Sequence, residues 1–273
     1  MSTWFITGAS SGLGRALTEQ AVAAGHQVVA TARDTSTLAD VAAQHPDQVV
    51  VLPLDVTDPD SRSSAVAEAE RRCGGIDVLV NNAGYGYTAA VEEGEDDAVS
   101  RLFATNFFGP AALIRAALPG MRARGAGTVV NISSIGARAS VPGGGYYSAA
   151  KAALEGLSGA LRKEVEQLGL HVVVVEPGSF RTDFRGRSAA RASTTIDAYD
   201  AVLGRTGDKV LGPQRGEPAK AAAAILEAVQ ATEPPGLLVL GTDALEGFRQ
   251  VAAAEAQDVA AYEHLSRSTD TTS

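Results

Sequence analysis

The sequence predicts an α/β fold in which a single domain contains a doubly wound, mostly parallel sheet of seven strands flanked by helices. Three observations indicate this. Short runs rich in β-branched residues alternate with alanine-rich stretches along nearly all of the 273 residues. Several of the runs are continuously apolar, which is typical of strands buried on both faces of a parallel sheet. Repeated strand–helix–strand units join parallel neighbours by right-handed crossovers, which place helices on both faces.

Each element has its own signal. Helix starts lie between the strands, as in TDPDS, where Thr57 or Asp58 can cap a helix and Pro59 suits its first turn. Two long alanine-rich helices are expected around 96–120 and 146–168. The strands are expected at 4–7, 27–31, 48–54, 76–81, 127–132, 171–177 and 236–240.

Two segments depart from the alternation. Residues 183–217 are rich in small, polar and basic side chains, and we expect them to form a lid over a substrate site. Residues 264–273 lack periodicity and are expected to be a disordered tail. Because no linker and no internal repeat interrupts the chain, residues 1–273 are expected to form one domain.

Composition narrows the function. The net charge of −9 disfavours a nucleic-acid partner or an anionic membrane surface. There is no signal-like N-terminus and no apolar run near the roughly 20 residues that span a bilayer. The single Cys73 fits a reducing compartment, so a cytoplasmic protein is expected, and an arginine-rich, alanine-rich composition suggests a bacterial genome. The four histidines are scattered without HExxH or CxxC spacing, so no metal site is expected.

The first predicted strand is followed by TGASSGLG, in which Gly8, Gly12 and Gly14 open an alanine-rich helix. Glycines at this place permit a tight turn and let backbone N–H groups and the helix N-terminus approach a pyrophosphate. A glycine-rich turn between the first strand and the first helix is the context that a dinucleotide-binding site requires.

The end of the second strand bears on which dinucleotide binds. Sites for NAD commonly place an acidic residue there, whereas VVATARD offers Ala32 followed by Arg33. The Arg33 guanidinium favours the extra 2′-phosphate of NADP. Asp34 could take the acidic role if the register shifted, so NADP(H) is expected to be preferred and NAD(H) stays an alternative.

The stretch GGGYYSAAK, residues 143–151, holds two tyrosines beside one lysine. In a helix, Tyr147 and Lys151 are four residues apart and share a face, whereas Tyr146 points elsewhere. An ammonium close to a phenol favours the phenolate, which lowers the tyrosine pKa toward the range useful for proton transfer. Taken alone, the spacing also fits an aromatic ring resting on a lysine stem.

With these motifs in place, the sequence resembles the NADP-preferring branch of the short-chain dehydrogenase/reductase family, which has TGxxxGxG and YxxxK motifs. The resemblance covers about residues 3–182 and continues in outline to residue 241. It also rests on LDVT with Asp55, NNAG at 81–84, ATNFFG with Asn106, NISSIG with Ser134, and EPGSFRT at 176–182. It implies a Rossmann fold and an oxidoreductase that interconverts a carbonyl (ketone or aldehyde) and an alcohol.

The family pattern assigns roles to single residues. It implies that Tyr147 is the general acid/base, that Ser134 holds the reacting oxygen, and that Lys151 binds the nicotinamide ribose. Asn106 would hold a water that links Lys151 to solvent, and Ser133 is the alternative to Ser134. The residues implied to bind the cofactor are Gly8, Ser10, Ser11, Gly12, Leu13, Gly14, Arg33, Asp55, Val56, Asn82, Ala83, Gly84, Tyr147, Lys151, Pro177, Gly178, Phe180 and Thr182.

The expected substrate is a hydrophobic small molecule, because the candidate contacts are apolar or aromatic. They are Tyr87, Val141, Tyr146 and Phe184, with Tyr85 and Phe180 as further candidates. The arginines of the excursion leave room for an acidic group on the substrate.

Two alternative functions and the expected assembly complete the prediction. A catalytically silent NADP(H)-binding sensor is the main alternative, although such proteins typically lack the tyrosine or the lysine. An epimerase or dehydratase of the longer related family would carry a larger C-terminal domain. A homodimer or homotetramer is expected, because the two long alanine-rich helices often pair in the family.

Overall fold

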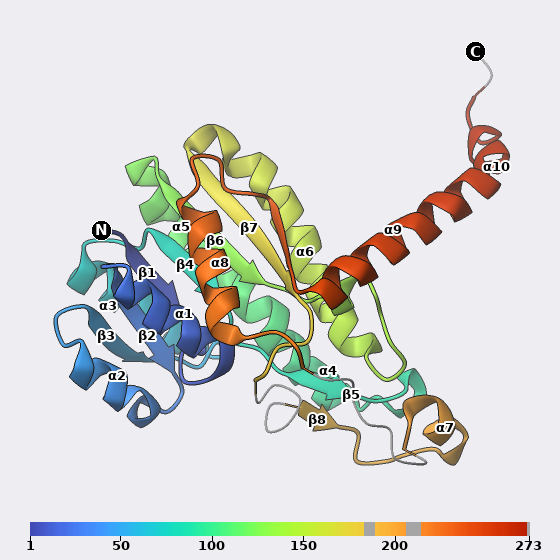
Figure 1. The fold of residues 1–273 in the computed structure, drawn as a ribbon, viewed down its shortest axis with the longest axis horizontal. Helices are drawn as coiled ribbons and strands as arrows, with labels where there is room; N and C mark the ends of the chain where they lie inside the picture. The colour runs from blue at the N-terminus through green and yellow to red at the C-terminus, as the bar shows by residue number, and fades with distance from the viewer. Residues whose placement is uncertain (183–188, 206–213, 272–273) are drawn as a thin grey trace.

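The computed structural model describes residues 1–182, 189–205 and 214–271. Its centre is a seven-stranded sheet of order β3-β2-β1-β4-β6-β7-β9, in which all neighbouring strands are parallel (Figure 1). The strands are β1 (Thr3–Ile6), β2 (Gln27–Ala32), β3 (Val49–Pro53), β4 (Val78–Asn81), β6 (Gly127–Ile132), β7 (Leu170–Pro177) and β9 (Leu237–Leu240). Each lies within two residues of its expected bounds, and the doubly wound α/β fold is confirmed.

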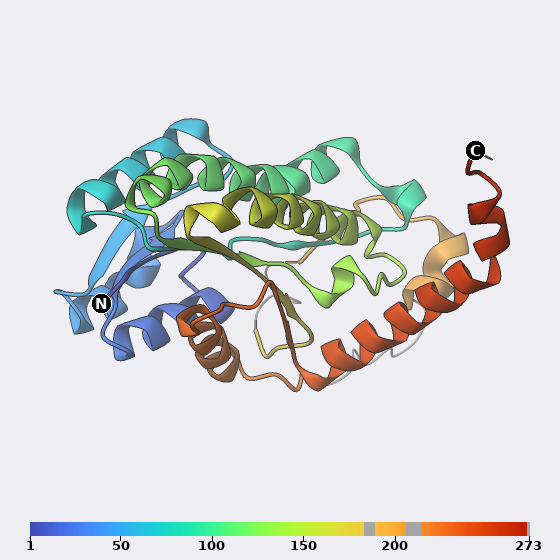
Figure 2. The same ribbon diagram turned by 90° about the horizontal axis from the view of Figure 1, so that it is seen from above.

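Helices cover both faces of the sheet (Figure 2). Helices α1 (Gly12–Ala23), α2 (Ala39–Gln44) and α8 (Pro218–Gln230) lie on one side. The other side carries α3 (Pro59–Cys73), α5 (Gly109–Arg124) and α6 (Gly145–Val165).

Two hydrophobic cores result, one on each face of the sheet. Trp4 and Ile6 pack with α1 and α8, whereas Phe5 between them packs with α3 and α5. All three side chains are fully buried. Because both faces of each central strand are covered, alternation of apolar and polar residues is absent and the runs are continuously apolar.

The predicted helix around 96–120 is divided into three parts. Helix α4 (Asp96–Phe103) continues into a π-helical turn, Ala104–Phe108, and then into α5. A π-helical turn inserts one residue into a helix and is common at functional sites. Here it carries Asn106 inward, where the side chain is fully buried.

Residues 189–205 of the 183–217 excursion are fixed to the segment before α4. Strand β8 (Ala189–Arg191) pairs in parallel with β5 (Gly86–Thr88), and neither strand was expected from the sequence. Helix α7 (Asp200–Leu203) follows. The excursion's remaining parts, 183–188 and 206–213, lie outside the described residues, so the lid stays a prediction.

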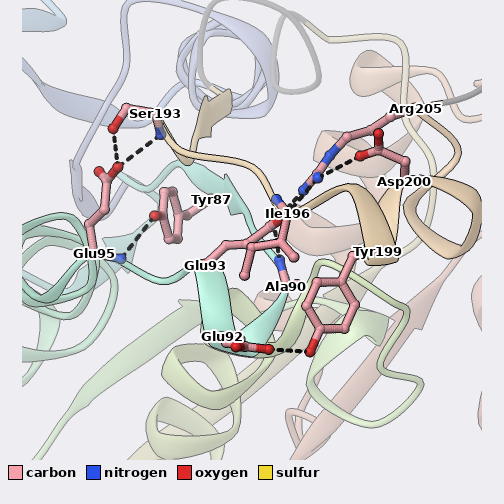
Figure 3. A network of polar contacts seen from close by, with 10 residues as sticks. All are labelled: Tyr87, Ala90, Glu92, Glu93, Glu95, Ser193, Ile196, Tyr199, Asp200 and Arg205. Carbon is pink, nitrogen blue, oxygen red and sulfur yellow. Dashed lines mark hydrogen bonds and ion pairs between the residues drawn. The ribbon is translucent and has the colours of Figure 1, made fainter.

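The buried carboxylate of Glu93 anchors this part of the excursion (Figure 3). It accepts hydrogen bonds from the backbone N–H groups of Ala90, at 2.9 Å, and Ile196, at 2.7 Å. Both of its oxygens also bind the guanidinium of Arg205, which lies 3.0 Å from Asp200 as well. We call this arrangement of Glu93, Ile196 and Arg205 the clasp.

The C-terminal helix α9 (Thr242–Ala261) starts beside β9 and projects away from the body of the molecule (Figures 1 and 2). It is followed by α10 (Glu263–Arg267), which differs from the disordered tail expected over 264–273. The helical turn has a local cause, because Arg267 forms an ion pair with Glu263 four residues earlier. Across the described ranges, no helix is both long and apolar enough to cross a membrane.

The clasp should make stability depend on acid pH. The Arg205 guanidinium, together with the Ile196 and Ala90 N–H groups, holds the pKa of Glu93 at about 2, below its ordinary 4.5. A depressed folded-state pKa adds stability above pH 4.5 that is lost as the pH falls toward 2. Glu93→Gln should therefore lower Tm at pH 7, and the difference from wild type should shrink below pH 4.5. Thermal unfolding followed by circular dichroism measures both.

The exposed Glu164→Gln on α6 is the matched control and should leave Tm unchanged at either pH. A Glu93→Gln deficit that stays the same from pH 7 to pH 3 would show that the carboxylate charge contributes nothing.

Candidate active site

The glycine-rich turn lies between β1 and α1, where the strand order reverses. Gly8 and Gly12 have φ angles of 64° and 56°, a region that residues with side chains rarely adopt. A Cβ at Gly14 would lie 2.3 Å from the Gly8 carbonyl oxygen and 2.4 Å from Asn82 Nδ2. The turn therefore requires glycine at these positions to bring the start of α1 against the segment after β4.

Thr7 and Asn82 hold the turn in place. Asn82 Nδ2 donates to the carbonyl oxygens of Thr7, at 2.8 Å, and Gly8, at 3.2 Å. Thr7 Oγ1 accepts from the N–H groups of Asn82 and Ala83, both at 2.9 Å. Ser11, the N-cap of α1, makes no capping hydrogen bond with its side chain. The positive end of the α1 dipole is therefore available to an anion such as a pyrophosphate.

A cavity of about 830 Å³ opens at the carboxyl edge of the sheet. Such a volume is within the range of ligand pockets. Every residue expected to bind the cofactor lines this cavity except Gly14, which lies beneath the turn. The donor set fits a dinucleotide, because an uncapped helix start and a cationic Arg33 face one continuous space. Within the described ranges, no group of His, Cys, Asp or Glu could hold a metal ion.

Arg33 and Asp55 lie where β2 and β3 border the cavity. Hydrogen bonds from Thr57, and more weakly the charge of Arg33, lower the pKa of Asp55. Asp34 is used by its own turn: its Oδ1 accepts from the Ser36 N–H, at 3.0 Å, and the Ser36 hydroxyl, at 2.7 Å. It caps a short 3₁₀ turn and is absent from the cavity lining, because β2 already ends at Ala32.

Tyr147 and Lys151 share one face of α6, and both line the cavity. Lys151 Nζ lies 5.9 Å from the centroid of the Tyr147 ring and donates a 2.7 Å hydrogen bond to the Ile132 carbonyl oxygen at the end of β6. Ser134, two residues beyond β6, hydrogen-bonds Tyr147 and accepts from the Gly136 N–H at 3.0 Å. The two hydroxyls and the ammonium thus form one wall of the cavity.

Burial controls the protonation of this wall. It raises the pKa of Tyr147 to about 12, against an opposing hydrogen bond from Ser134. It also lowers the pKa of Lys151 to about 8. Lys151 is not among the causes of the Tyr147 shift, which are burial and the opposing hydrogen bond with Ser134, so a lowering of the tyrosine pKa by Lys151 stays a prediction. Tyr147 is therefore protonated at neutral pH, as a proton donor must be.

The structure separates the two neighbouring serines. The Ser133 hydroxyl is buried and donates to Glu155 Oε1 at 2.5 Å, away from Tyr147. The Ser134 hydroxyl hydrogen-bonds Tyr147. The geometry favours Ser134 as the residue that meets a reacting oxygen.

Asn106 lies behind the wall rather than in the cavity lining. Its Nδ2 donates to the Tyr85 carbonyl oxygen at 2.8 Å, and its Oδ1 accepts from the Tyr85 N–H at 3.1 Å. A Cβ on Gly84 would lie 2.8 Å from Asn106 Oδ1 and 3.5 Å from Lys151 Nζ. Asn106 and Lys151 thus pack around the same glycine, and the role of Asn106 in holding a water stays a prediction.

Three of the expected substrate contacts do not line the cavity. Tyr87 is 2% exposed, and its hydroxyl accepts from the Glu95 N–H at 3.3 Å. Tyr146 packs against Tyr87 and donates to the Val91 carbonyl oxygen at 2.6 Å. Val141 is 65% exposed. Both tyrosines turn into a small core beside α4, so a contact of Tyr87, Tyr146 or Val141 with substrate stays a prediction, and Phe184 lies outside the described residues.

Tyr85 and Phe180, the further candidates, do line the cavity. So do residues that sequence reasoning missed, on α4 and its π-helical turn and in the excursion: Arg101, Ala104, Thr105, Ala189, Ala190 and Gln214. Arg101, Ala104 and Thr105 recur at helical spacing, so their shared helix face could have been predicted from the position of Asn106. Ala189 and Ala190 reach the cavity through the β5–β8 pairing, which no local pattern shows.

Known proteins resemble this chain over most of its length. Residues 2–192 match the family model described as short chain dehydrogenase. Oxidoreductase BOA17 of Botryotinia fuckeliana is 37% identical over 247 residues, covering 89% of this chain and 90% of that protein. The 3-ketodihydrosphingosine reductase of Bacteroides thetaiotaomicron is 36% identical over 233 residues, covering 84% of each.

Solved structures of other proteins share the fold of this chain over most of its length. A short-chain dehydrogenase from Streptomyces avermitilis superposes with a TM-score of 0.93 at 44% identity, covering 99% of this chain and 100% of that one. A short chain dehydrogenase from Burkholderia cenocepacia in complex with NADP has a TM-score of 0.76 at 26% identity, covering 95% and 96%. The 3-ketoacyl-(acyl-carrier-protein) reductase from Brucella melitensis, complexed with NADH, has a TM-score of 0.73 at 25% identity, covering 88% and 96%.

The cofactor-sized cavity beside an uncapped helix start, the Tyr147–Ser134–Lys151 wall and these comparisons lead to one conclusion. This chain belongs to the short-chain dehydrogenase/reductase family of oxidoreductases.

Proposed function

We propose that the protein is an NADP(H)-dependent oxidoreductase that interconverts a ketone or aldehyde and an alcohol on a hydrophobic small molecule, with Tyr147 as general acid/base. The observation that carries this is the wall formed by Tyr147, Ser134 and Lys151 on the dinucleotide-sized cavity. A catalytically silent sensor would not need a protonated tyrosine hydrogen-bonded to Ser134 beside a buried lysine.

A nicotinamide dinucleotide held in this cavity would supply the hydride in reduction and accept it in oxidation. Ser134 holds the substrate oxygen by a hydrogen bond, and Tyr147 donates a proton to that oxygen in reduction or removes it in oxidation. Lys151, fixed by the Ile132 carbonyl oxygen, binds the nicotinamide ribose and stabilises the tyrosinate that proton donation leaves.

Arg33 supports the preference for NADP(H). Its exposed guanidinium lines the cavity after β2, where a 2′-phosphate would form charge-assisted hydrogen bonds. Asp34, the residue that would favour NAD(H), already accepts two hydrogen bonds from Ser36.

The lining favours a hydrophobic substrate. Tyr85, Phe180, Ala189 and Ala190 give apolar or aromatic surface to the cavity. The relative named for reduction of 3-ketodihydrosphingosine suggests a keto group on an apolar chain as the first compound class to test.

Assembly as a homodimer or homotetramer is part of this proposal. The π-helical turn between α4 and α5 exposes Phe108, which is 59% accessible. Burial of this side chain against a second copy would remove apolar surface from water. Size-exclusion chromatography with light scattering should give a multiple of the 27.9 kDa chain, and a monomer mass at assay concentration would remove this part of the proposal.

The proposed function is tested by NADPH absorbance with apolar ketones, aldehydes and quinones. Tyr147→Phe should lower kcat by at least about 100-fold, because the proton donor is lost, while NADPH binding measured by fluorescence is retained. Tyr146→Phe removes only a hydrogen bond to the Val91 carbonyl oxygen and is the matched control. Near-normal turnover by Tyr147→Phe would refute the role given to this residue.

Arg33→Ala should change cofactor choice. Loss of the guanidinium should lower kcat/KM for NADPH by about 10- to 100-fold and leave that for NADH nearly unchanged. The exposed Arg71→Ala on α3, whose partner Glu68 lies outside the cavity, is the control. Equal losses with both dinucleotides would contradict the preference for NADP(H).

A further inference from the structure

Two glutamates lie behind the Tyr147–Ser134–Lys151 wall. Glu155 is one helical turn after Lys151 on α6, so Tyr147, Lys151 and Glu155 follow one face of the helix. Glu176 is on β7, immediately before Pro177 of the cavity lining. Their side chains are 14% and 0% exposed.

The pair is tied to the wall and to the C-terminal helix. Glu155 Oε1 accepts the Ser133 hydroxyl at 2.5 Å. Arg138, which follows the 3₁₀ turn Ile135–Ala137, donates to Glu176 Oε1 at 2.6 Å and lies 3.3 Å from Glu155 Oε2. The same guanidinium lies 5.3 Å from the centroid of the Phe248 ring on α9.

One oxygen in this cluster lacks a donor. Glu176 Oε2 is buried and accepts no hydrogen bond from the described part of the chain. The two carboxyl groups are within hydrogen-bonding reach of each other. A single guanidinium faces them both, and two adjacent buried carboxylates are costly to ionise together.

A proton on Glu155 resolves both problems. It gives Glu176 Oε2 a donor and leaves one negative charge for Arg138. Burial, and to a smaller extent the neighbouring Glu176, raises the pKa of Glu155, against the hydrogen bond from Ser133.

We propose that Glu155 and Glu176 share one proton, held on Glu155, and that Glu155 is a positioning residue for the reaction. Glu155 holds Ser133 by a hydrogen bond and thereby helps to position the next residue, Ser134. The proton on Glu155 also determines how much negative charge Lys151 faces. This inference rests on the proposed function, because it concerns the same three residues.

The charge on Glu155 acts directly on Lys151. An ionised Glu155 raises the pKa of Lys151, against the dominant lowering by burial. Two further titratable or charged groups of the described residues face this cluster: Tyr147, beside Lys151 on α6, and Arg138, beside the two glutamates. Glu255 on α9 acts in turn on Arg138. Holding the proton on Glu155 therefore keeps the Lys151 ammonium easier to deprotonate.

Two amide substitutions of nearly equal size leave the negative charge on different residues. In Glu155→Gln, position 155 stays neutral and the charge resides on Glu176, as in the wild type, so the pKa of Lys151 should stay unchanged. In Glu176→Gln, the new amide donates to Glu155, which becomes the ionised group, so the pKa of Lys151 should rise. The alkaline limb of kcat/KM against pH, which reports loss of the Lys151 proton, should stay in place in the first variant and move up by about one pH unit in the second.

Matched variants separate this effect from simple damage. Glu155→Ala should lower kcat because Ser133 loses its acceptor, whereas Glu155→Gln keeps an acceptor and should retain most of kcat. Glu164→Gln, exposed on the same helix, should leave the profile unchanged. A shift of the limb in Glu155→Gln, or no upward shift in Glu176→Gln, would overturn the proposal.

Infrared spectroscopy tests the proton without turnover. Wild type near neutral pH should show the carbonyl band of a protonated carboxylic acid, and both Glu155→Gln and Glu176→Gln should lose it. If no carbonyl compound is reduced, the proposed function fails, yet this band still decides whether the proton is shared. Its absence from wild type would refute the inference even in an active enzyme, and even if a variant failed to fold.

Discussion

The close approach of the glycine-rich turn to the segment after β4 is the constraint on which the site depends. Gly14 leaves no room for a Cβ between the Gly8 carbonyl oxygen and the Asn82 amide. That contact brings the start of α1 to the point where the strand order reverses, with its first turn free of a side-chain cap. A dinucleotide site at this edge follows from the packing of backbone against backbone, and no large side chain has to move.

The chemistry of the wall depends on burial. Lys151 is 4% exposed, and Tyr147 and Lys151 respond to desolvation in opposite ways, since the phenol stays protonated while the ammonium loses its proton more readily. The Ile132 carbonyl oxygen orients Lys151, and the Ser134 hydroxyl orients Tyr147. Behind them, Glu155 and Glu176 form a second layer of ionisable side chains that does not line the cavity. The wall therefore has a second layer of side chains behind it, and its protonation depends on both layers together.

The opposite wall of the cavity is built from distant segments. The clasp around Glu93 fixes residues 189–205 over the chain that leads into α4, and the short β5–β8 ladder carries Ala189 and Ala190 to the cavity. Because a buried carboxylate with a guanidinium and two N–H partners is costly to break, this wall has a defined position in the described residues. The shape of the substrate space follows from these non-local contacts.

The parallel sheet, the glycine-rich turn and the pairing of Tyr147 with Lys151 could be predicted from the amino-acid sequence alone, because each depends on spacing within one strand, turn or helix. The residues expected to bind the cofactor also followed from motifs, and all of them except Gly14 line one cavity. Three features became visible in the folded chain alone: Tyr87 and Tyr146 turn away from the cavity, Ser133 faces Glu155, and Glu93 anchors residues 189–205. These outcomes depend on which distant segments meet, and a side chain's partner across the fold leaves no mark in its local sequence.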